Sequence, residues 1–278
     1  MRAEEVLRQG DLDESLRLLQ EQVRREPANA RYRIFLFQLL AVMGRWERAL
    51  NQLEVAGELD AGALAMVQTY REALRCEVLR ADIFAGKRSP LIFGQPDEWL
   101  ALLIEAQRLL AHGESERSAS LRGLALEAAP ATAGRIDDSA FTWIMDGDSR
   151  LGPVLEAIVN GRYYWIPFQS IRGLTLDKPQ DLRDLVWMPA HFTWVNGGES
   201  AGLIPTRYPG SEASRDPELR LSRRTEWLEA TDGSFLGQGQ RMLFTDTGEY
   251  PLMNLRSLVF DTEPIPAPST DPEGAARG

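Results

Sequence analysis

The residues best suited to chemistry are carboxylates in the second half of the chain. Asp146 and Asp148 flank Gly147 after an expected strand, and Glu156 and His191 follow them. Hard divalent cations need several oxygen ligands, so these side chains define one alternative, a metal-dependent enzyme of unknown reaction. Aspartates around a glycine are also ordinary turn residues, and the run lacks the later acidic positions of an EF-hand loop. We favour the structural role and expect no catalysis, metal or cofactor.

The single cysteine, Cys76, gives a second possible reactive group. It lies on an expected helix with Arg71, Arg75 and Arg80, whose charges could lower the pKa of its thiol. No histidine stands nearby in sequence to act as its base, so we favour a semi-buried residue of an amphipathic helix. One cysteine also excludes a disulfide within the chain, which fits a reducing cytoplasm.

The elements that carry these residues begin with a repeat. Gly10–Leu16 aligns with Gly44–Leu50 at an offset of 34 residues (44 − 10), which is the tetratricopeptide period. Further helices are expected over Ala63–Phe84, Trp99–Leu110 and Leu121–Ala128. The pattern predicts an all-helical, tetratricopeptide-like domain over residues 1–130. Stacks of this kind bind peptides on their inner face.

The inner-face positions of the full repeat unit are candidate partner-binding residues. They are Arg31, Ile34, Gln38 and Ala41. Packing of these side chains against neighbouring helices is an equally good interpretation. Both interpretations therefore stay open from the sequence.

After the small residues Ala129–Arg135 the pattern changes to short β-rich runs, such as Tyr163–Ile166 and Ile171–Leu176. Asn196-Gly197-Gly198 is a strong hairpin signal. A helix is expected over Leu151–Asn160, with Pro153 in its first turn and Gly161 closing it. These features predict an α+β domain over residues 136–261 with a mainly antiparallel sheet. Four prolines within residues 262–278 predict a disordered, Pro-rich tail.

Arginines and carboxylates recur beside aromatic residues in this second domain. Arginine forks can pair with acids and stack on aromatic rings, so we hypothesise a structural network rather than a recognition surface. The residues of this network are Arg183, Asp184, Trp187, Arg207, Tyr208 and Trp227.

The net charge of the chain limits the classes of partner that it is expected to bind. The formal net charge is −10, which opposes approach to phosphate backbones and anionic lipid. The most apolar early stretch, Ile34–Met43, is about half the roughly 20 residues that span a bilayer. We therefore expect neither nucleic acid nor membrane as a partner.

Several motifs of the second domain occur together and in order: Asp146–Glu156, Gly161–Pro167, Asp181–Trp187, Ile204–Gly210, Arg224–Trp227 and Gly237–Arg241. With the helical first half, they resemble the TagJ/ImpE family of accessory proteins of bacterial type VI secretion systems. The resemblance implies a noncatalytic, cytoplasmic protein that binds the N-terminal helix of the small contractile-sheath subunit, TssB. It also implies a link to sheath assembly, or to recycling of the sheath by the unfoldase ClpV.

Overall fold

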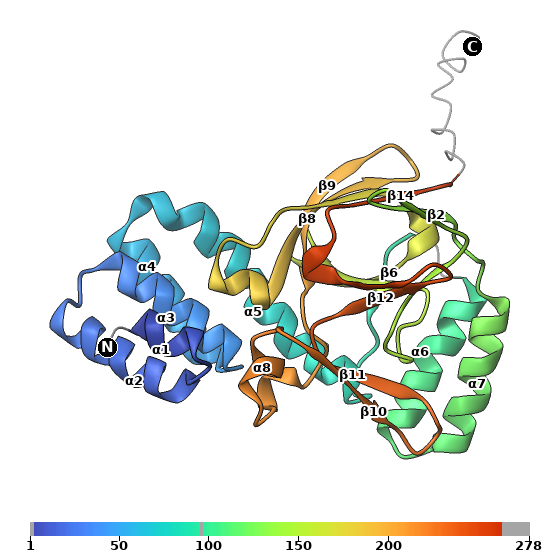
Figure 1. The fold of residues 1–278 in the computed structure, drawn as a ribbon, viewed down its shortest axis with the longest axis horizontal. Helices are drawn as coiled ribbons and strands as arrows, with labels where there is room; N and C mark the ends of the chain where they lie inside the picture. The colour runs from blue at the N-terminus through green and yellow to red at the C-terminus, as the bar shows by residue number, and fades with distance from the viewer. Residues whose placement is uncertain (1–2, 95–96, 263–278) are drawn as a thin grey trace, which may run out of the picture.

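The computed structural model describes residues 3–94 and 97–262. Its N-terminal part consists of paired helices, α1 (Ala3–Arg8), α2 (Leu12–Arg25), α3 (Ala30–Val42) and α4 (Trp46–Leu59) (Figure 1). The side chains of Asp11 and Asn29 accept backbone N–H bonds at the starts of α2 and α3, as N-cap residues do. The predicted helical repeat is confirmed.

The chain continues with α5 (Leu64–Phe84), α6 (Glu98–Ala111) and α7 (Ser115–Ala128), of which α5 is the longest. A short α8 (Pro217–Arg220) lies within the strand-rich part. Five 3-10 helices join the other elements: η1 (Ala61–Ala63), η2 (Phe168–Ser170), η3 (Leu182–Leu185), η4 (Ser211–Ala213) and η5 (Leu252–Asn254).

A nine-stranded sheet dominates the second part, in the order β1-β6-β5-β9-β8-β7-β14-β2-β3. Only its β1–β6 pair is parallel, so the predicted mainly antiparallel sheet is confirmed. The strands are β1 (Leu91–Ile92), β2 (Gly134–Ile136), β3 (Ser139–Phe141), β5 (Val154–Val159), β6 (Arg162–Pro167), β7 (Ile171–Leu176), β8 (Trp187–Trp194), β9 (Glu199–Pro205) and β14 (Ser257–Phe260). The Asn196-Gly197-Gly198 turn joins β8 to β9, as expected.

Two smaller sheets complete the strand-rich part. One has the order β13-β12-β4 and the other is the hairpin β10-β11. Their strands are β4 (Ile144–Asp146), β10 (Thr225–Glu229), β11 (Phe235–Gly239), β12 (Met242–Thr245) and β13 (Glu249–Pro251).

The helix predicted over Leu151–Asn160 is wrong, because this segment forms strand β5. All six residues of β5 are buried, and a continuous apolar run in a buried strand cannot be told from a helix by periodicity. Gly161 does not cap a helix. Asn160 and Gly161 have φ values of 51° and 72°, which are the two positive values of a type I′ hairpin turn. This turn joins β5 to β6.

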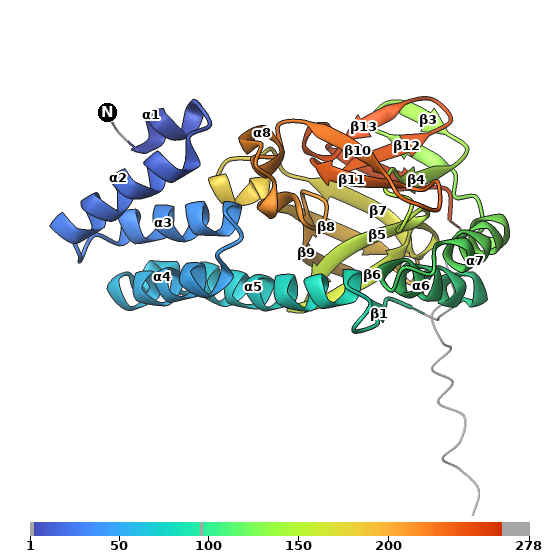
Figure 2. The same cartoon turned by 90° about the horizontal axis from the view of Figure 1, so that it is seen from below.

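The sheet lies between two layers. Helices α5 and α6 run along one face of it, and the small sheets lie on the other (Figure 2). One hydrophobic core contains Leu39 and Leu74 from the helices together with Trp165 and Trp187 from the strands. The helical and strand-rich parts are therefore packed against each other as one body. Residues 263–278, most of the expected tail, lie outside the described residues.

Candidate functional site

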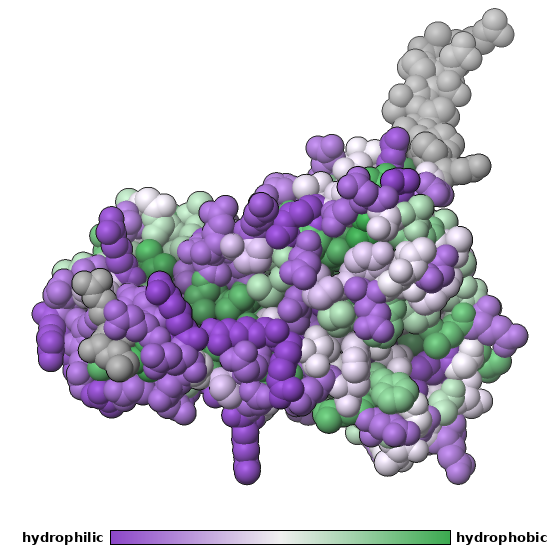
Figure 3. Space-filling model, in the orientation of Figure 1, coloured by the Kyte–Doolittle hydropathy of each residue, from purple (hydrophilic) through white to green (hydrophobic). Residues whose placement is uncertain are grey.

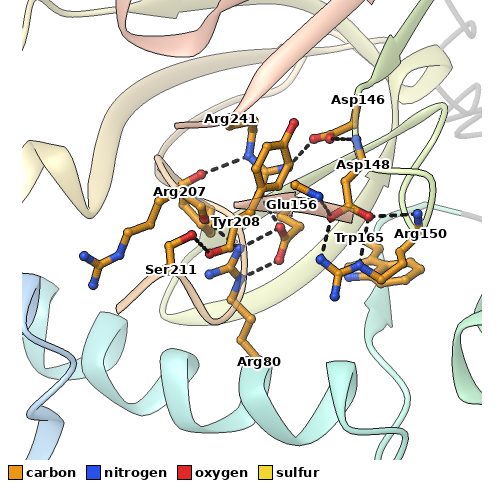
Figure 4. Close-up of polar contacts among 12 residues, drawn as sticks. Arg80, Asp146, Asp148, Arg150, Glu156, Trp165, Arg207, Tyr208, Ser211 and Arg241 are labelled. Atoms are coloured by element: carbon orange, nitrogen blue, oxygen red, sulfur yellow. Dashed lines mark hydrogen bonds and ion pairs between the residues drawn. The ribbon is translucent and has the colours of Figure 1, made fainter. Parts of the chain in front are cut away.

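A buried ion cluster joins helix α5 to the sheets. Arg80 of α5 donates to both carboxylate oxygens of Glu156 on β5, at 2.6 and 2.9 Å. Arg241 contacts both Glu156 and Asp146. These four side chains are at most 4% exposed, and Figure 4 shows them converging from α5, β4, β5 and the segment just before β12. Arg241 thus bridges two buried carboxylates, and one of them, Glu156, also pairs with Arg80.

The carboxylates of the cluster differ in their proton affinity. Burial disfavours the charge of Glu156, but Arg80 and Arg241 outweigh it and lower the pKa of this group to about 2. Burial raises the pKa of Asp146 to about 6, in spite of the opposing effect of Arg241. A carboxylate with two guanidinium partners stays ionised at neutral pH, so Glu156 is a fixed charge and a poor general acid.

Asp148 is held in the same way on the neighbouring turn. Its carboxylate accepts from Arg150 Nε at 2.8 Å and from the backbone N–H of Gly237 at 2.9 Å. Arg150 in turn lies 4.8 Å from the ring centre of Phe84. These contacts tie the turn to α5 and β11, which agrees with the structural role favoured from the sequence.

The three carboxylates of the alternative enzyme lie near one another, because the Asp148 backbone N–H donates to Asp146 and Arg241 contacts both Asp146 and Glu156. His191 lies apart from them. Asp146, Asp148 and Glu156 contact arginines, whereas His191 is exposed on β8 and lines a surface groove. In the part of the chain that the structure describes, no three His, Cys, Asp or Glu side chains are grouped so that they could hold a metal ion.

Cys76 does not have the depressed pKa that neighbouring arginines could give. Burial, assisted by the negative charges of Glu77 and Glu72, raises the pKa of its thiol to about 12. Its Sγ lies 3.6 Å from the carbonyl oxygen of Gly161. Because the thiolate is the reactive form, this cysteine is a packing residue.

The inner face of the repeat is turned toward the chain itself. Gln38 is 6% exposed and Ala41 is fully buried, while Arg31 is exposed and Ile34 half-buried. The 3-10 helix η3 packs against α3. In this conformation a partner could therefore reach only Arg31 and Ile34 of the four candidate positions.

The expected arginine network is replaced by separate contacts. Arg183 pairs with Asp181 and lies 4.8 Å from the ring centre of Tyr70. Asp184 accepts the backbone N–H groups of residues 180 and 181, at 2.8 and 2.9 Å. Trp187 donates to Glu77 at 2.9 Å. Each contact fixes a local turn or the interface with α5.

Arg207 makes the clearest link between the two parts of the chain. It is 2% exposed and donates to the carbonyl oxygens of Val42 at 2.7 Å and Ala41 at 3.0 Å. Burial lowers the pKa of its guanidinium to about 10. The C-terminal end of a helix carries partial negative charge, which favours a cation there. Arg207 therefore caps α3 from the strand-rich part.

Tyr208 and Trp227 belong to an aromatic contact between strands. The Tyr208 hydroxyl accepts the backbone N–H of Met242 at 2.9 Å, and its ring centre lies 5.6 Å from that of Trp227. Trp227 also packs against Phe244. Like Arg207, these residues hold elements together.

A groove of about 700 Å³ lies beside α5, and we call it the α5 groove. Helix α5 forms one wall and the sheet forms the other. Small side chains keep it open. The lining residues are Ala65, Met66, Gln68, Thr69, Tyr70, Glu72, Ile158, Asn160, Gly161, Arg183, Pro189, Ala190, His191, Ala201, Gly202 and Leu203.

Within residues 3–94 and 97–262, no helix covers the sheet beyond this groove. Ala201, His191, Thr175 and Ser257 form one row across four neighbouring strands, and the first three are exposed. Trp187 lies on the same face of β8 but packs against helices. In Figure 3 the N-terminal helices are largely hydrophilic, and a hydrophobic area lies where they meet the strand-rich part.

The fold defines a class, a helical-repeat protein joined to a strand-rich part. Residues 6–73 match the family described as tetratricopeptide repeat, and residues 138–259 match the ImpE protein family. The chain is 55% identical to the type VI secretion system accessory component TagJ of Pseudomonas aeruginosa, over 94% of this chain and 92% of that protein. It belongs to the TagJ/ImpE family of type VI secretion accessory proteins.

A solved structure has the same fold. Protein VPA1032 from Vibrio parahaemolyticus has a TM-score of 0.85 and 25% sequence identity, with 94% of this chain and 98% of that chain covered. Within the described residues, no helix combines the length and the apolar character needed to cross a bilayer.

Proposed function

We propose that this protein is a noncatalytic adaptor that binds the N-terminal helix of the small contractile-sheath subunit, TssB. It acts in the cytoplasm, during sheath assembly or during recycling of the sheath by ClpV. The α5 groove is the observation that carries the proposal. It is mainly apolar, and it borders a sheet face on which Ala201 and His191 are exposed.

A helix laid in the α5 groove would lie beside α5 and extend the helical layer of Figure 2. Burial of an amphipathic face in such a groove is a recurring mode of peptide recognition. The small side chains of Ala201 and Ala65 would allow close approach. Both are exposed, so they are open to a ligand.

The family relationship supports a protein partner, because the TagJ relative is itself described as an accessory component of the secretion system. The ion pairs of Asp146, Asp148 and Glu156 make these side chains poor candidates for catalysis. The adaptor is therefore preferred to the metal-dependent enzyme.

Calorimetric titration with a synthetic N-terminal helix of the cognate TssB tests the proposal. We expect saturable binding, which Ala201→Arg weakens about ten-fold or more, or about 1.4 kcal/mol. Ala140→Arg is the matched control, because Ala140 is an exposed alanine on β3 of the same sheet. Affinity weaker than about −5.5 kcal/mol, or a Kd above about 100 μM, would contradict the function. Binding that Ala201→Arg leaves unchanged would contradict only the α5 groove.

A further inference from the structure

A small hollow lies where the tip of the β10–β11 hairpin meets α7 (Figure 1). Its volume is about 260 Å³, below the roughly 300–1,000 Å³ of a small-molecule pocket, so it suits one inserted side chain. Ala119 and Leu126 of α7 give it an apolar wall. The charged groups of its lining, Arg122, Asp232 and Asp146, are all held in ion pairs. The hollow therefore favours an apolar group.

Gly123 keeps the α7 side of this hollow open. It lies inside the helix and lines the hollow, although glycine is the least favourable residue in a helix after proline. A Cβ added at Gly123 would meet no described atom within 4 Å, so packing within the described residues does not require a glycine. Its lack of a side chain does allow another molecule to approach the helix closely.

Apolar side chains continue from the hollow onto the strands. Met145, which lines the hollow, is the cross-strand partner of Phe244, and the ring centre of Phe244 lies 5.6 Å from that of Trp227. Phe235 shares the face of Trp227 on the hairpin. Phe235 is 51% exposed and Leu126 is 38% exposed, and the other three are half-buried. We call Leu126, Met145, Trp227, Phe235 and Phe244 the aromatic patch.

Carboxylates stand at fixed positions beside the rings of this patch. Glu229 is the cross-strand partner of Phe235, and Glu249 is that of Phe244. Such partners lie about 5 Å apart on one face of a sheet, and both glutamates are exposed. Among the described residues, the strands of the two small sheets, β4 and β10 to β13, contain no lysine or arginine. The exposed charge beside the rings is therefore negative.

We propose that the aromatic patch binds a basic segment of a second protein partner, which inserts one apolar side chain into the hollow. Lysine or arginine beside that side chain pairs with Glu229 and Glu249. An anchor in a pocket, surrounded by contacts that exclude water, is the usual arrangement of an interface hot spot. An acidic segment would be repelled by the same glutamates, so the charge of the patch selects its ligand.

The aromatic patch is separate from the α5 groove. The described lining of its hollow shares no residue with that of the α5 groove. This proposal therefore stands whether or not the α5 groove binds TssB. The variant Ala201→Arg should have no effect at the aromatic patch, which separates the two proposals.

Two designed peptides test the proposal with the full-length protein. They share a centre of leucine and phenylalanine, and their flanking residues are all lysine or all glutamate. We expect fluorescence anisotropy to show saturable binding of the lysine peptide only, with a Kd below about 100 μM. Raising the salt from about 0.05 to about 0.5 M should weaken the complex, because surface charge pairs are screened. Absence of binding by the lysine peptide, or equal binding of both peptides, would overturn the proposal.

The net charge of −10 attracts any basic peptide, so variants of the patch supply the decisive comparison. Phe235→Ala should weaken binding of the lysine peptide about ten-fold or more. The control, Leu228→Ala, removes a side chain of nearly equal exposure, 50%, from the opposite face of the same hairpin and should leave the affinity unchanged. Both side chains are half exposed, so neither variant should prevent folding. Equal affinities of the two variants would overturn the proposal.

A second pair of variants tests the hollow itself. Gly123→Gln places a side chain at the hollow and should weaken binding of the lysine peptide about ten-fold or more. It should not lower the melting temperature, because glutamine is a better helix former than glycine. Ser120→Gln, at an exposed position of α7 outside the hollow, is the control and should leave the affinity unchanged. Unchanged affinity of Gly123→Gln would contradict insertion of a side chain into the hollow.

Discussion

At the scale of single residues, the carboxylates that look most suited to catalysis instead hold distant segments of the chain together. Glu156 accepts hydrogen bonds from Arg80 and contacts Arg241, so three segments distant in sequence meet at one side chain. Removing one partner of a buried ion group leaves uncompensated charge in the interior. Any other arrangement of these segments would leave buried charges unpaired, so the cluster stabilises the native arrangement over the alternatives.

Glu156→Gln should destabilise the protein by about 3–5 kcal/mol at pH 7, because it leaves Arg80 and Arg241 short of a negative charge. The folded pKa of Glu156, about 2, lies below its ordinary value of 4.5. Its contribution is therefore complete above pH 4.5 and is lost as the pH falls toward 2. The difference between wild type and variant should shrink over that range.

Urea unfolding at a series of pH values measures this difference. Glu127→Gln, at an exposed position of α7, is the control and should change the free energy of unfolding by less than about 0.5 kcal/mol. A deficit for Glu156→Gln that does not change between pH 7 and pH 3 would show that the charge of Glu156 is not its main contribution.

At the scale of elements, the cap of α3 is formed by a residue far away in sequence. Arg207 donates to carbonyl groups at the end of this helix, and also to the carbonyl oxygen of Arg220, at 2.7 Å. Carbonyl oxygens stabilise the guanidinium without neutralising it, which explains why burial still lowers its pKa.

Arg207→Met should destabilise the protein by about 1–3 kcal/mol, because buried carbonyl groups lose their donors. Thermal unfolding followed by circular dichroism measures the change. Arg215→Met, at an exposed arginine, should leave the melting temperature nearly unchanged. Stabilisation by Arg207→Met would mean that the cost of burying the charge exceeds the value of its hydrogen bonds.

The elements also show what the sequence could predict. The 34-residue offset between Gly10 and Gly44 (44 − 10) predicted the first helices. The Asn196-Gly197-Gly198 turn predicted a hairpin, which joins β8 to β9. The segment of β5 was mistaken for a helix because Pro153 and Gly161 fit helix ends, although Asn160-Gly161 was itself a hairpin signal.

The site was less predictable than the fold. The ion cluster joins Arg80 to residues of the second half, and local spacing carries no information on contacts between such distant segments. Arg241 stood at the end of a motif, Gly237–Arg241, but nothing in sequence paired it with Asp146. The α5 groove depends on how α5 packs on the sheet, so it too required the structure.

At the scale of the whole molecule, the two expected domains share a core. Trp187 lies with its ring centre 5.6 Å from that of Tyr70 and 6.1 Å from that of Trp46. Both partners are helical residues, while Trp187 begins β8. A large contact of this kind couples the stability of the two parts.

Trp187→Ala should destabilise the protein by about 3–5 kcal/mol and should do so in both parts together. Amide hydrogen exchange measures this, with protection expected to fall in α3 and in β8 alike. Loss of protection confined to the strand-rich part would show that the helical part folds independently. Wild-type protein should unfold in one calorimetric transition.

Helix α5 has a geometric consequence for the assembly. Its 21 residues give it a length of about 30 Å, and it packs against α4 near its start and is anchored by Arg80 near its end. Because α5 is fixed at both ends, it keeps a constant distance and angle between the elements packed along it. A ligand in the α5 groove would thus be held in one set orientation relative to the repeat helices and to the strand-rich part.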